Sequence, residues 1–429
     1  MRSCWGWLPV TTLRRRPGVD SGGALGPPPL SRSGTLVYAA RVNNPRLCSL
    51  VALLVLGACG GQSPAPVAPA SAAPLASPPP VASATPTPAA APRSMHDLQL
   101  ASLRAYVAAF NRHDSKAVAA LYAPEAVFIE RGRPANAGQA AIAADYQNYF
   151  DAYPDVSTTI TRSWHWGDAT LFEYVEGGTQ TGQRIILPPA PQRFDPLADG
   201  KDDGKAPDRR SETPTGKKFG YVGASLLRFT PEGLVRLDQT YSDELTREVQ
   251  SGWAPGALAK MPVRAVVPVP PVTDSWEIHQ VGASDAGQAK LLAAKTKLYN
   301  RFSLHSEKDF LAALTDDVVL ATYDDPQDAR GKKEAAALLK DWTTTFADGV
   351  EDATEGWSVD GYVVLMGVFT GKHVGAWGPI KPTRNAFKTH FLDIVKLGKD
   401  DKVERLWSYA NNYELLQYLD YKSADAKKP

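Results

Sequence analysis

The sequence predicts an α+β protein built from two tandem copies of one domain, each with its helices ahead of an antiparallel run of strands. Two observations predict this fold class. Residues 164–182 align without a gap on residues 357–375, and the matched positions keep their order on both sides, which indicates a duplication. Within each copy, apolar residues recur first at helical spacing and later at the alternating spacing of strands.

The elements of the first copy follow from that spacing. Leu103, Tyr106 and Phe110 recur on one helical face, after which polar turn residues separate shorter segments. The predicted helices cover residues 98–110, 116–122 and 139–150. The predicted strands, where apolar and polar residues alternate, cover residues 169–177, 219–229 and 234–241.

The two copies match at particular residues and differ by one insertion. The matched pairs are Trp164 with Trp357, Gly178 with Gly371, Gly182 with Gly375, Val235 with Val403, and Tyr241 with Tyr409. The first copy has about 25 additional residues, at about 187–212. Their Pro, Gly and alternating charges predict an exposed loop, with a lid over a pocket as the alternative. A Pro-rich linker over residues 251–274 joins the copies.

Composition excludes several classes of protein. Lys and Arg number 47 and Asp and Glu 46, so no basic excess points to nucleic acid as a partner. The three cysteines, Cys4, Cys48 and Cys59, lie in the first sixty residues, which excludes a disulfide framework in the folded part. The seven histidines are scattered without metal-ligand spacing, and no phosphate loop or Gly-x-Ser-x-Gly motif occurs. We therefore expect no metal and no cofactor.

The only long apolar run, residues 47–58, predicts a secretory leader. It is about a dozen residues long, whereas a helix needs roughly 20 residues to span a membrane. Arg41 and Arg46 precede it and small residues end it, which is typical of a signal peptide over residues 41–58. The sequence Leu56-Gly57-Ala58-Cys59 resembles the bacterial lipobox, which implies a lipid on Cys59. The alternatives are an ordinary cleaved signal with an incidental cysteine, and a buried helix.

The segments on either side of the leader are not expected to fold. Residues 1–40 contain Arg and Pro without periodicity, and we expect translation to start instead near Val37 or Val42. Residues 59–94 consist almost entirely of small residues and proline, which predicts an extended tether. Gly60, not Asp, follows the cysteine. These features favour a lipid-anchored protein of the bacterial cell envelope, at the outer membrane or on the periplasmic face.

The first copy resembles the SnoaL-like group of the nuclear transport factor 2-like superfamily. The resemblance is carried by NRHD (111–114), GTQTG (178–182), PTGKK (214–218) and the closing pattern from Tyr241 to Thr246 with Gln250 and Gly252. It covers residues 97–252, and the second copy resembles the group more weakly over 280–420. We accordingly expect domains over residues 95–250 and 275–425.

This resemblance implies an architecture and a kind of site. Each domain should be a cone, in which a curved antiparallel sheet wraps around helices and encloses a mostly apolar pocket. Domains of this group commonly pair through their sheets, so the two copies are expected to pair within the chain. A small apolar or aromatic ligand is the partner that such a pocket implies.

The last predicted strand of the first copy carries the candidate catalytic residues. Val235 and Leu237 mark an apolar face, and strict alternation puts Gln239, Tyr241 and Asp243 on that face. The resemblance implies proton transfer by an Asp in the cone without a cofactor. Asp243 matches that motif, with Tyr241 as a hydrogen-bond donor to a carbonyl or enolate. The alternative is that Asp243 caps the helical turn that follows it.

Other residues are candidates for ligand binding or for packing. Alternation favours Glu173 as a second inward carboxylate, with a solvated outer face as the alternative. Tyr106 and Trp166 are expected to line the pocket, and Trp164 to pack. His113 and His305 lie in helix–helix turns, where we expect them to hydrogen-bond backbone.

The second copy departs from the first at the candidate catalytic position. Asn411 stands where the first copy has Asp243, and an amide cannot exchange a proton near neutral pH. If one copy is catalytic, we therefore expect it to be the first. Trp407 and Tyr409 are the ligand-binding candidates of the second copy, in which an inward Arg405 beside Trp407 would suit an anionic or aromatic ligand.

Three functions remain open on the sequence alone. The first is an exported lipoprotein that binds a small apolar or aromatic molecule in one or both cones. The second is a cofactor-free cyclase, isomerase or hydrolase that uses Asp243. The third is a non-catalytic interaction module of the cell envelope, with filled cones.

Overall fold

The computed structural model describes residues 94–186, 210–280 and 305–419, except 132 and 134, together with 291, 294, 298, 299 and 303. The expected leader, Cys59, the tether and most of the insertion at 187–212 lie outside the described residues. In the described part, no helix has the length and apolar character needed to cross a membrane. The described residues all belong to one compact unit.

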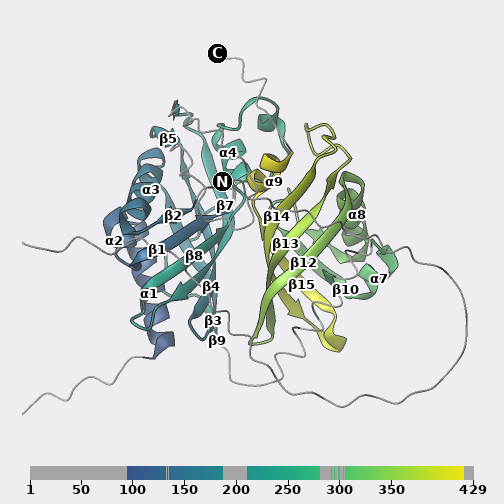
Figure 1. The fold of residues 1–429 in the computed structure, drawn as a ribbon, viewed down its shortest axis with the longest axis horizontal. Coiled ribbons are helices and arrows are strands. Elements are labelled where there is room, and N and C mark those ends of the chain that lie inside the picture. The colour runs from purple at the N-terminus through teal and green to yellow at the C-terminus, as the bar shows by residue number, and fades with distance from the viewer. Residues whose placement is uncertain are drawn as a thin grey trace, which may run out of the picture. The chain divides into compact units, whose positions relative to one another are not determined.

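The first domain is a curved sheet with helices on its inner face (Figure 1). Its helices are α1 (Met95–Phe110), α2 (Ser115–Ala119), α3 (Gln139–Ala152) and α4 (Glu244–Ser251). Its strands are β1 (Tyr122–Glu130), β2 (Asn136–Ala137), β3 (Ser157–Trp166), β4 (Ala169–Thr179), β7 (Lys218–Phe229) and β8 (Val235–Tyr241). The strand order is β2-β1-β8-β7-β4-β3-β9, with β9 (Glu277–Gln280) at the edge, and β5 (Arg184–Ile186) pairs with β6 (Arg210–Glu212) beside the insertion.

The linker between the domains has structure of its own. It contains the short 3-10 helix η1 (Gly256–Lys260) and β9 (Glu277–Gln280), which adds to the sheet edge as a parallel partner of β3. The backbone N–H of Val267 donates to the carbonyl of Gly220 at 2.8 Å. The Pro-rich segment therefore runs along the first domain.

The second domain repeats this arrangement. Its described helices are α7 (Glu307–Ala312), α8 (Gly331–Thr345), η3 (Lys399–Asp401) and α9 (Asn412–Tyr418). Its strands are β10 (Leu314–Thr322), β11 (Ala329–Arg330), β12 (Phe346–Val359), β13 (Tyr362–His373), β14 (Ala386–Leu397) and β15 (Val403–Ala410), in the order β11-β10-β15-β14-β13-β12. In each domain the first long strand pairs in parallel with the last one, β1 with β8 and β10 with β15.

Local sequence explains where the first helix begins and ends. Ser94 and Asp97 form a reciprocal capping box at the start of α1. After the helix, His113 takes a positive φ of 55° and its Nε2 lies 2.8 Å from the carbonyl oxygen of Val156. His305 repeats this with φ of 52° and a contact of 2.9 Å to Gly349. The prediction that these two histidines hydrogen-bond backbone in a turn is confirmed.

A β-bulge near the start of the last strand decides which side chains face the cone. Val235 is opposite Phe229 on β7, but Leu237 is opposite Arg228, so Arg236 is an additional residue on β8. Val235 belongs to the core inside the cone. After the bulge, Asp238 and Thr240 face inward, and Tyr241 faces outward. The second domain has the same irregularity between Leu397 and Lys396, opposite Val403 and Arg405.

The outer faces of the two sheets share one buried apolar cluster. It contains Trp164, Leu171, Leu226 and Tyr241 from the first domain and Val364, Met366, Leu392, Ile394, Trp407 and Tyr409 from the second. The hydroxyl of Tyr409 donates to Glu173, and the amide of Asn411 donates to the carbonyl of Arg131. The expected pairing of the two copies through their sheets is thus confirmed.

Candidate functional site

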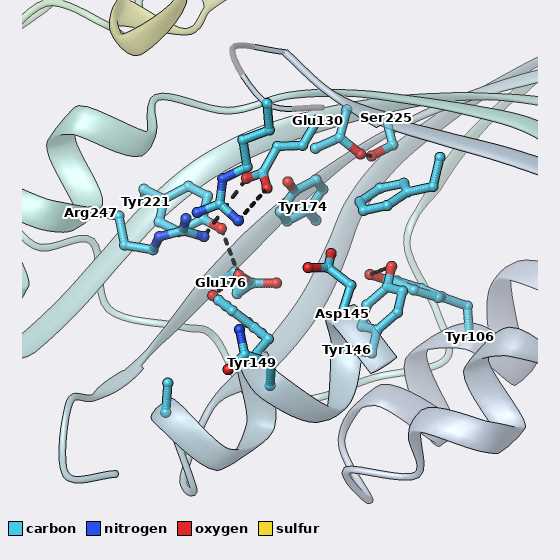
Figure 2. Close-up of a pocket in the computed structure, with 15 residues that line it drawn as sticks. Tyr106, Glu130, Asp145, Tyr146, Tyr149, Tyr174, Glu176, Tyr221, Ser225 and Arg247 are labelled. Carbon is cyan, nitrogen blue, oxygen red and sulfur yellow. Dashed lines mark hydrogen bonds and ion pairs between the residues drawn. The ribbon is translucent and has the colours of Figure 1, made fainter. Parts of the chain in front are cut away.

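The cone of the first domain holds a cavity of about 60 Å³ whose walls combine five tyrosines with polar and charged side chains (Figure 2). The lining residues come from α1, α3, α4, the inner faces of β1, β4, β7 and β8, and the segment between β1 and β2. They are Tyr106, Phe128, Glu130, Arg133, Asp145, Tyr146, Asn148, Tyr149, Ala152, Tyr174, Glu176, Tyr221, Ser225, Thr240 and Arg247. Tyr106 therefore lines this cavity, as expected.

Glu176 is a buried carboxylate in that wall. It accepts hydrogen bonds from the hydroxyls of Tyr149 and Tyr221, the latter at 2.6 Å. Burial raises its pKa, although the two hydroxyls and nearby Arg247 act in the opposite direction. Glu176 and its tyrosines thus form a fixed polar group inside an aromatic wall.

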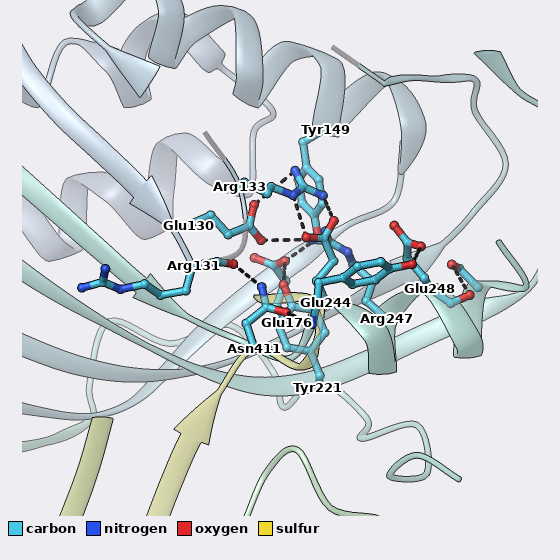
Figure 3. Close-up of polar contacts among 12 residues, drawn as sticks. Glu130, Arg131, Arg133, Tyr149, Glu176, Tyr221, Glu244, Arg247, Glu248 and Asn411 are labelled. Carbon is cyan, nitrogen blue, oxygen red and sulfur yellow. Dashed lines mark hydrogen bonds and ion pairs between the residues drawn. The ribbon is translucent and has the colours of Figure 1, made fainter. Parts of the chain in front are cut away.

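Two arginines and two glutamates form a cluster beside the same cavity (Figure 3). Arg133 contacts Glu130 at 3.1 Å, and its Nε donates to Glu244 at 2.7 Å. Arg247 contacts Glu244 at 3.0 Å and Glu130 at 3.8 Å. The guanidinium of Arg247 also lies 5.3 Å from the centre of the Tyr149 ring. The cluster holds two positive and two negative charges.

Asp238 is the inward carboxyl that the alternation argument missed in the first domain. It accepts hydrogen bonds from the hydroxyl of Tyr122 at 2.7 Å and from that of Thr240 at 3.2 Å. Burial raises the pKa of Asp238 to about 7. Both of its oxygens are therefore held by hydroxyls of the first domain.

The cone of the second domain holds a cavity of about 80 Å³ with a different character. Its described apolar lining is Leu298, Phe310, Leu320, Leu338, Leu339, Trp342, Phe369, Phe391, Leu406, Ala410 and Leu415. Three carboxyls, Asp324, Glu351 and Asp393, reach this apolar space together with Thr322, Thr389, Ser408 and Asn412. No Lys or Arg is among the described residues that line it.

Asp393 is the best-placed of these carboxyls for chemistry. The hydroxyl of Tyr299 donates to its Oδ2 at 2.6 Å, and among the described groups its Oδ1 has no hydrogen-bond partner. Burial raises the pKa of Asp393 to about 6. Burial and the neighbouring carboxyls also raise the pKa of Glu351 and of Asp324. The sequence signal for this site is the Asp inside the apolar run FLDIV (391–395), because a carboxyl is rarely buried without a role.

The structure corrects the positions expected for Tyr241 and Gln239. Tyr241 lies on the outer face of the sheet, where Arg131 donates to its hydroxyl at 3.0 Å and its ring packs in the cluster shared with the second domain. Gln239 is on the same outer face, opposite Leu226. The bulge at Arg236 inverts the alternation that Val235 began, so neither side chain enters the cone.

Asp243 is the N-cap of α4, which confirms the alternative interpretation of this residue. Its Oδ2 accepts from the backbone N–H of Thr246 at 3.0 Å, and its Oδ1 accepts from the backbone N–H of Asn412 at 3.1 Å. Burial raises its pKa to about 6. Asn411 is the N-cap of α9 and accepts from Tyr413 N–H at 2.9 Å. Since Asn and Asp cap helices equally well, the replacement between copies preserves a structural role.

Four other candidates also lie on the outer faces of the sheets and not in a cone. Glu173 forms an ion pair with Arg162 at 2.5 Å, and Tyr409 donates to it. Trp166 packs against Trp357 with ring centres 4.6 Å apart. Trp407 lies under the guanidinium of Arg162, 4.0 Å from the ring centre. The sequence predicts that these side chains are buried in a ligand pocket. In the structure, it is the second sheet that buries them. Trp164 is fully buried there, as expected for a packing residue.

Family comparisons agree with the duplicated fold. The profile of the SnoaL-like domain matches residues 103–237, and that of the SnoaL-like polyketide cyclase matches residues 293–419. No protein with a curated description matches the sequence significantly.

Several solved structures resemble one copy each at low identity. One is a hypothetical protein of Catenulispora acidiphila with a ketosteroid isomerase-like fold, in complex with trimethylamine, 20% identical, covering 35% of this chain and 92% of that one with a TM-score of 0.26. A protein of Jannaschia classed with the SnoaL-like polyketide cyclases is 12% identical, covering 33% and 99%, with a TM-score of 0.30. One of Xanthomonas campestris, classed as a polyketide cyclase, is 21% identical, covering 37% and 99%, with a TM-score of 0.26. The two profile matches and the two repeated cones show that the chain carries two SnoaL-like domains in tandem.

Proposed function

We propose that the cone of the second domain binds a small, mainly apolar molecule through one polar group that hydrogen-bonds a buried carboxyl. The observation that carries this proposal is the apolar cavity of about 80 Å³ into which Asp324, Glu351 and Asp393 project. A water-sized group occupies roughly 10–15 Å³ of such a cavity, so the space suits about five to eight non-hydrogen atoms. A small ring with one hydroxyl or carbonyl group has this size.

A phenol tests the binding proposal directly. We expect para-fluorophenol to bind the full chain with a Kd of about 1 mM, followed by fluorine NMR, since small ligands gain roughly 0.3–1.5 kcal/mol per atom. Ala410→Leu fills part of the cavity and should weaken binding about tenfold. Ala386→Leu, at an exposed position of β14, is the matched control and should leave binding unchanged. Absence of saturable binding would instead favour the envelope interaction module.

One observation favours proton transfer as a second candidate function. Asp393 lies in an apolar cavity with a raised pKa, a tyrosine hydroxyl on one oxygen, and a second oxygen that has no hydrogen-bond partner among the described residues. A carboxylate of this kind can take a proton from carbon next to a carbonyl and return it elsewhere, with Tyr299 positioned beside it. This would place a cofactor-free isomerase or cyclase activity in the second domain instead of the first.

Isomerisation of a β,γ-unsaturated cyclic ketone, followed by the absorbance of its conjugated product, tests this activity. Asp393→Asn should lower kcat by about 100-fold or more, the usual contribution of a general acid–base group. Asp243→Asn should leave kcat unchanged, because Asn replaces Asp as an N-cap. Loss of activity in Asp243→Asn, with activity kept in Asp393→Asn, would instead identify Asp243 as the catalytic residue.

We also propose that the protein is exported and anchored in the cell envelope through a lipid on Cys59. The support is the sequence alone, in which Leu56-Gly57-Ala58-Cys59 follows an apolar run and precedes a Pro/Ala-rich tether. Mass spectrometry of the mature amino terminus tests this proposal, since an unmodified Cys59 would exclude it.

A further inference from the structure

The first domain's cavity differs from the second in its charge as well as in its walls. The charged residues that line it are Arg133 and Arg247 with Glu130, Asp145 and Glu176. Both arginines are engaged by Glu130 and by Glu244, which lies beside the cavity, as Figure 3 shows. The five lining groups sum to a charge of −1 when ionised, and Glu244 adds a further negative charge. An anionic ligand is therefore disfavoured here.

One part of the wall of this cavity is aromatic. Five tyrosines and Phe128 line it, and Glu176 accepts hydrogen bonds from two of the tyrosine hydroxyls (Figure 2). The rest of the wall is polar, with Asp145, Asn148, Ser225, Thr240 and the ion pairs of the two arginines. In a cavity of about 60 Å³, any occupant lies close to several of these rings. A ring face attracts a cation within about 6 Å, most strongly where water is excluded. A metal ion, by contrast, requires several oxygen ligands converging on one point.

Arg247 is an example of a cation that contacts a tyrosine ring of this wall. Its guanidinium lies over the Tyr149 ring at 5.3 Å while its side chain is only 4% exposed. Arg247 belongs to α4 and Tyr149 to α3.

We propose that the first domain's cone is a separate binding site for a small organic cation, a quaternary or tertiary methylammonium group held by the tyrosine rings and Glu176. At roughly 10–15 Å³ for each water-sized group, the cavity has room for about four to six non-hydrogen atoms, which is the size of such a group. The site does not depend on the ligand or reaction proposed for the second domain. The chain would thus carry two cones with different ligand classes.

Two probes of equal shape test the charge preference on the unaltered full chain. Tetramethylammonium chloride should show saturable line broadening of its methyl proton signal, with sodium chloride keeping the ionic strength constant. The neutral isostere tert-butanol should bind at least about tenfold more weakly. Equal binding of both probes, or no saturable binding of tetramethylammonium, would overturn the proposal without any variant. Phosphocholine binding tighter than tetramethylammonium would assign the site to a lipid headgroup, and weaker binding to a free amine.

Variants then locate the site. Glu176→Gln keeps the shape of the side chain and should weaken tetramethylammonium binding about tenfold. Glu232→Gln removes one exposed carboxylate from the same domain and should have no effect. Ala410→Leu in the second cone should also have none, which separates this site from the one proposed there. An unchanged affinity in Glu176→Gln, with its melting temperature preserved, would exclude Glu176 from the site.

Discussion

Replacing Arg162 by methionine is expected to lower the free energy of unfolding by about 3–5 kcal/mol, because it leaves a buried carboxylate without its cation. Arg162 Nη2 lies 2.5 Å from Glu173 Oε2, and its Nε donates to Oε1 at 3.2 Å. The guanidinium is 4.0 Å from the centre of the Trp407 ring, and the hydroxyl of Tyr409 also donates to Glu173. The single variant would therefore leave the Glu173 carboxylate buried between two sheets without a cation.

The matching controls separate burial from simple loss of an ion pair. Arg162→Met combined with Glu173→Met removes both charges and should recover most of the lost stability, since apolar residues often replace a buried pair at little cost. Arg228→Met breaks the contact of Arg228 with Glu355 at 3.3 Å, where the glutamate side chain is 54% exposed, and should cost less than about 1 kcal/mol. Urea denaturation measures all three. An Arg162→Met variant no less stable than Arg228→Met would show that the outer faces do not form a dry interface.

Asp238→Asn is expected to destabilise the protein more at pH 5 than at pH 8, by roughly 2–3 kcal/mol. Burial raises the pKa of Asp238 from 3.8 to about 7, so the folded state binds its proton more tightly than the unfolded chain does. The stability that this contributes is complete below about pH 4 and is lost as the pH rises through 7. An Asn side chain does not titrate, so the difference between wild type and variant isolates this one group.

The comparison with a variant is needed because other groups respond in the opposite direction. Burial lowers the pKa of His165 to about 3, and its contribution is therefore lost as the pH falls below the usual histidine value of 6.5. Asp168→Asn is a suitable control. Ion pairs with Arg236 and Arg228 lower the pKa of Asp168, so its effect should be constant between pH 5 and pH 8. Thermal melts across this range measure both variants, and a pH-independent difference for Asp238→Asn would contradict the prediction.

The two cones show how one duplicated fold can acquire two chemistries. Ser225 in the first domain aligns with Asp393 in the second, and Asp238 aligns with Leu406. Each domain thus has an inward carboxyl on a strand where the other has none. The first cone surrounds its carboxylates with hydroxyls and guanidiniums, whereas the second leaves them in an apolar space. This difference is the reason for assigning the two cones different ligands.

Much of the fold was available from the sequence. The duplication, the first three helices and the strands β4, β7 and β8 were predicted close to their observed bounds. Local chemistry also predicted the turn roles of His113 and His305 and the capping alternative for Asp243, because each depends on residues a few positions away. Strands β1 and β3 were not predicted, and β1 interrupts the expected order of helices before strands.

The sites required the tertiary structure. By itself the sequence determined two SnoaL-like domains and the helical and strand segments within them. It could do so because hydrophobic periodicity and helix caps depend only on residues that are close in sequence. It could not show that Arg236 is an additional residue in β8, and one bulge is enough to exchange the faces of every following side chain. Nor could it show that Glu173, Trp407 and Tyr409 are buried by a second sheet and not by a ligand pocket. Only the pairing of strands and sheets decided which carboxyls, Asp238 and Asp393 instead of Asp243, lie inside the cones.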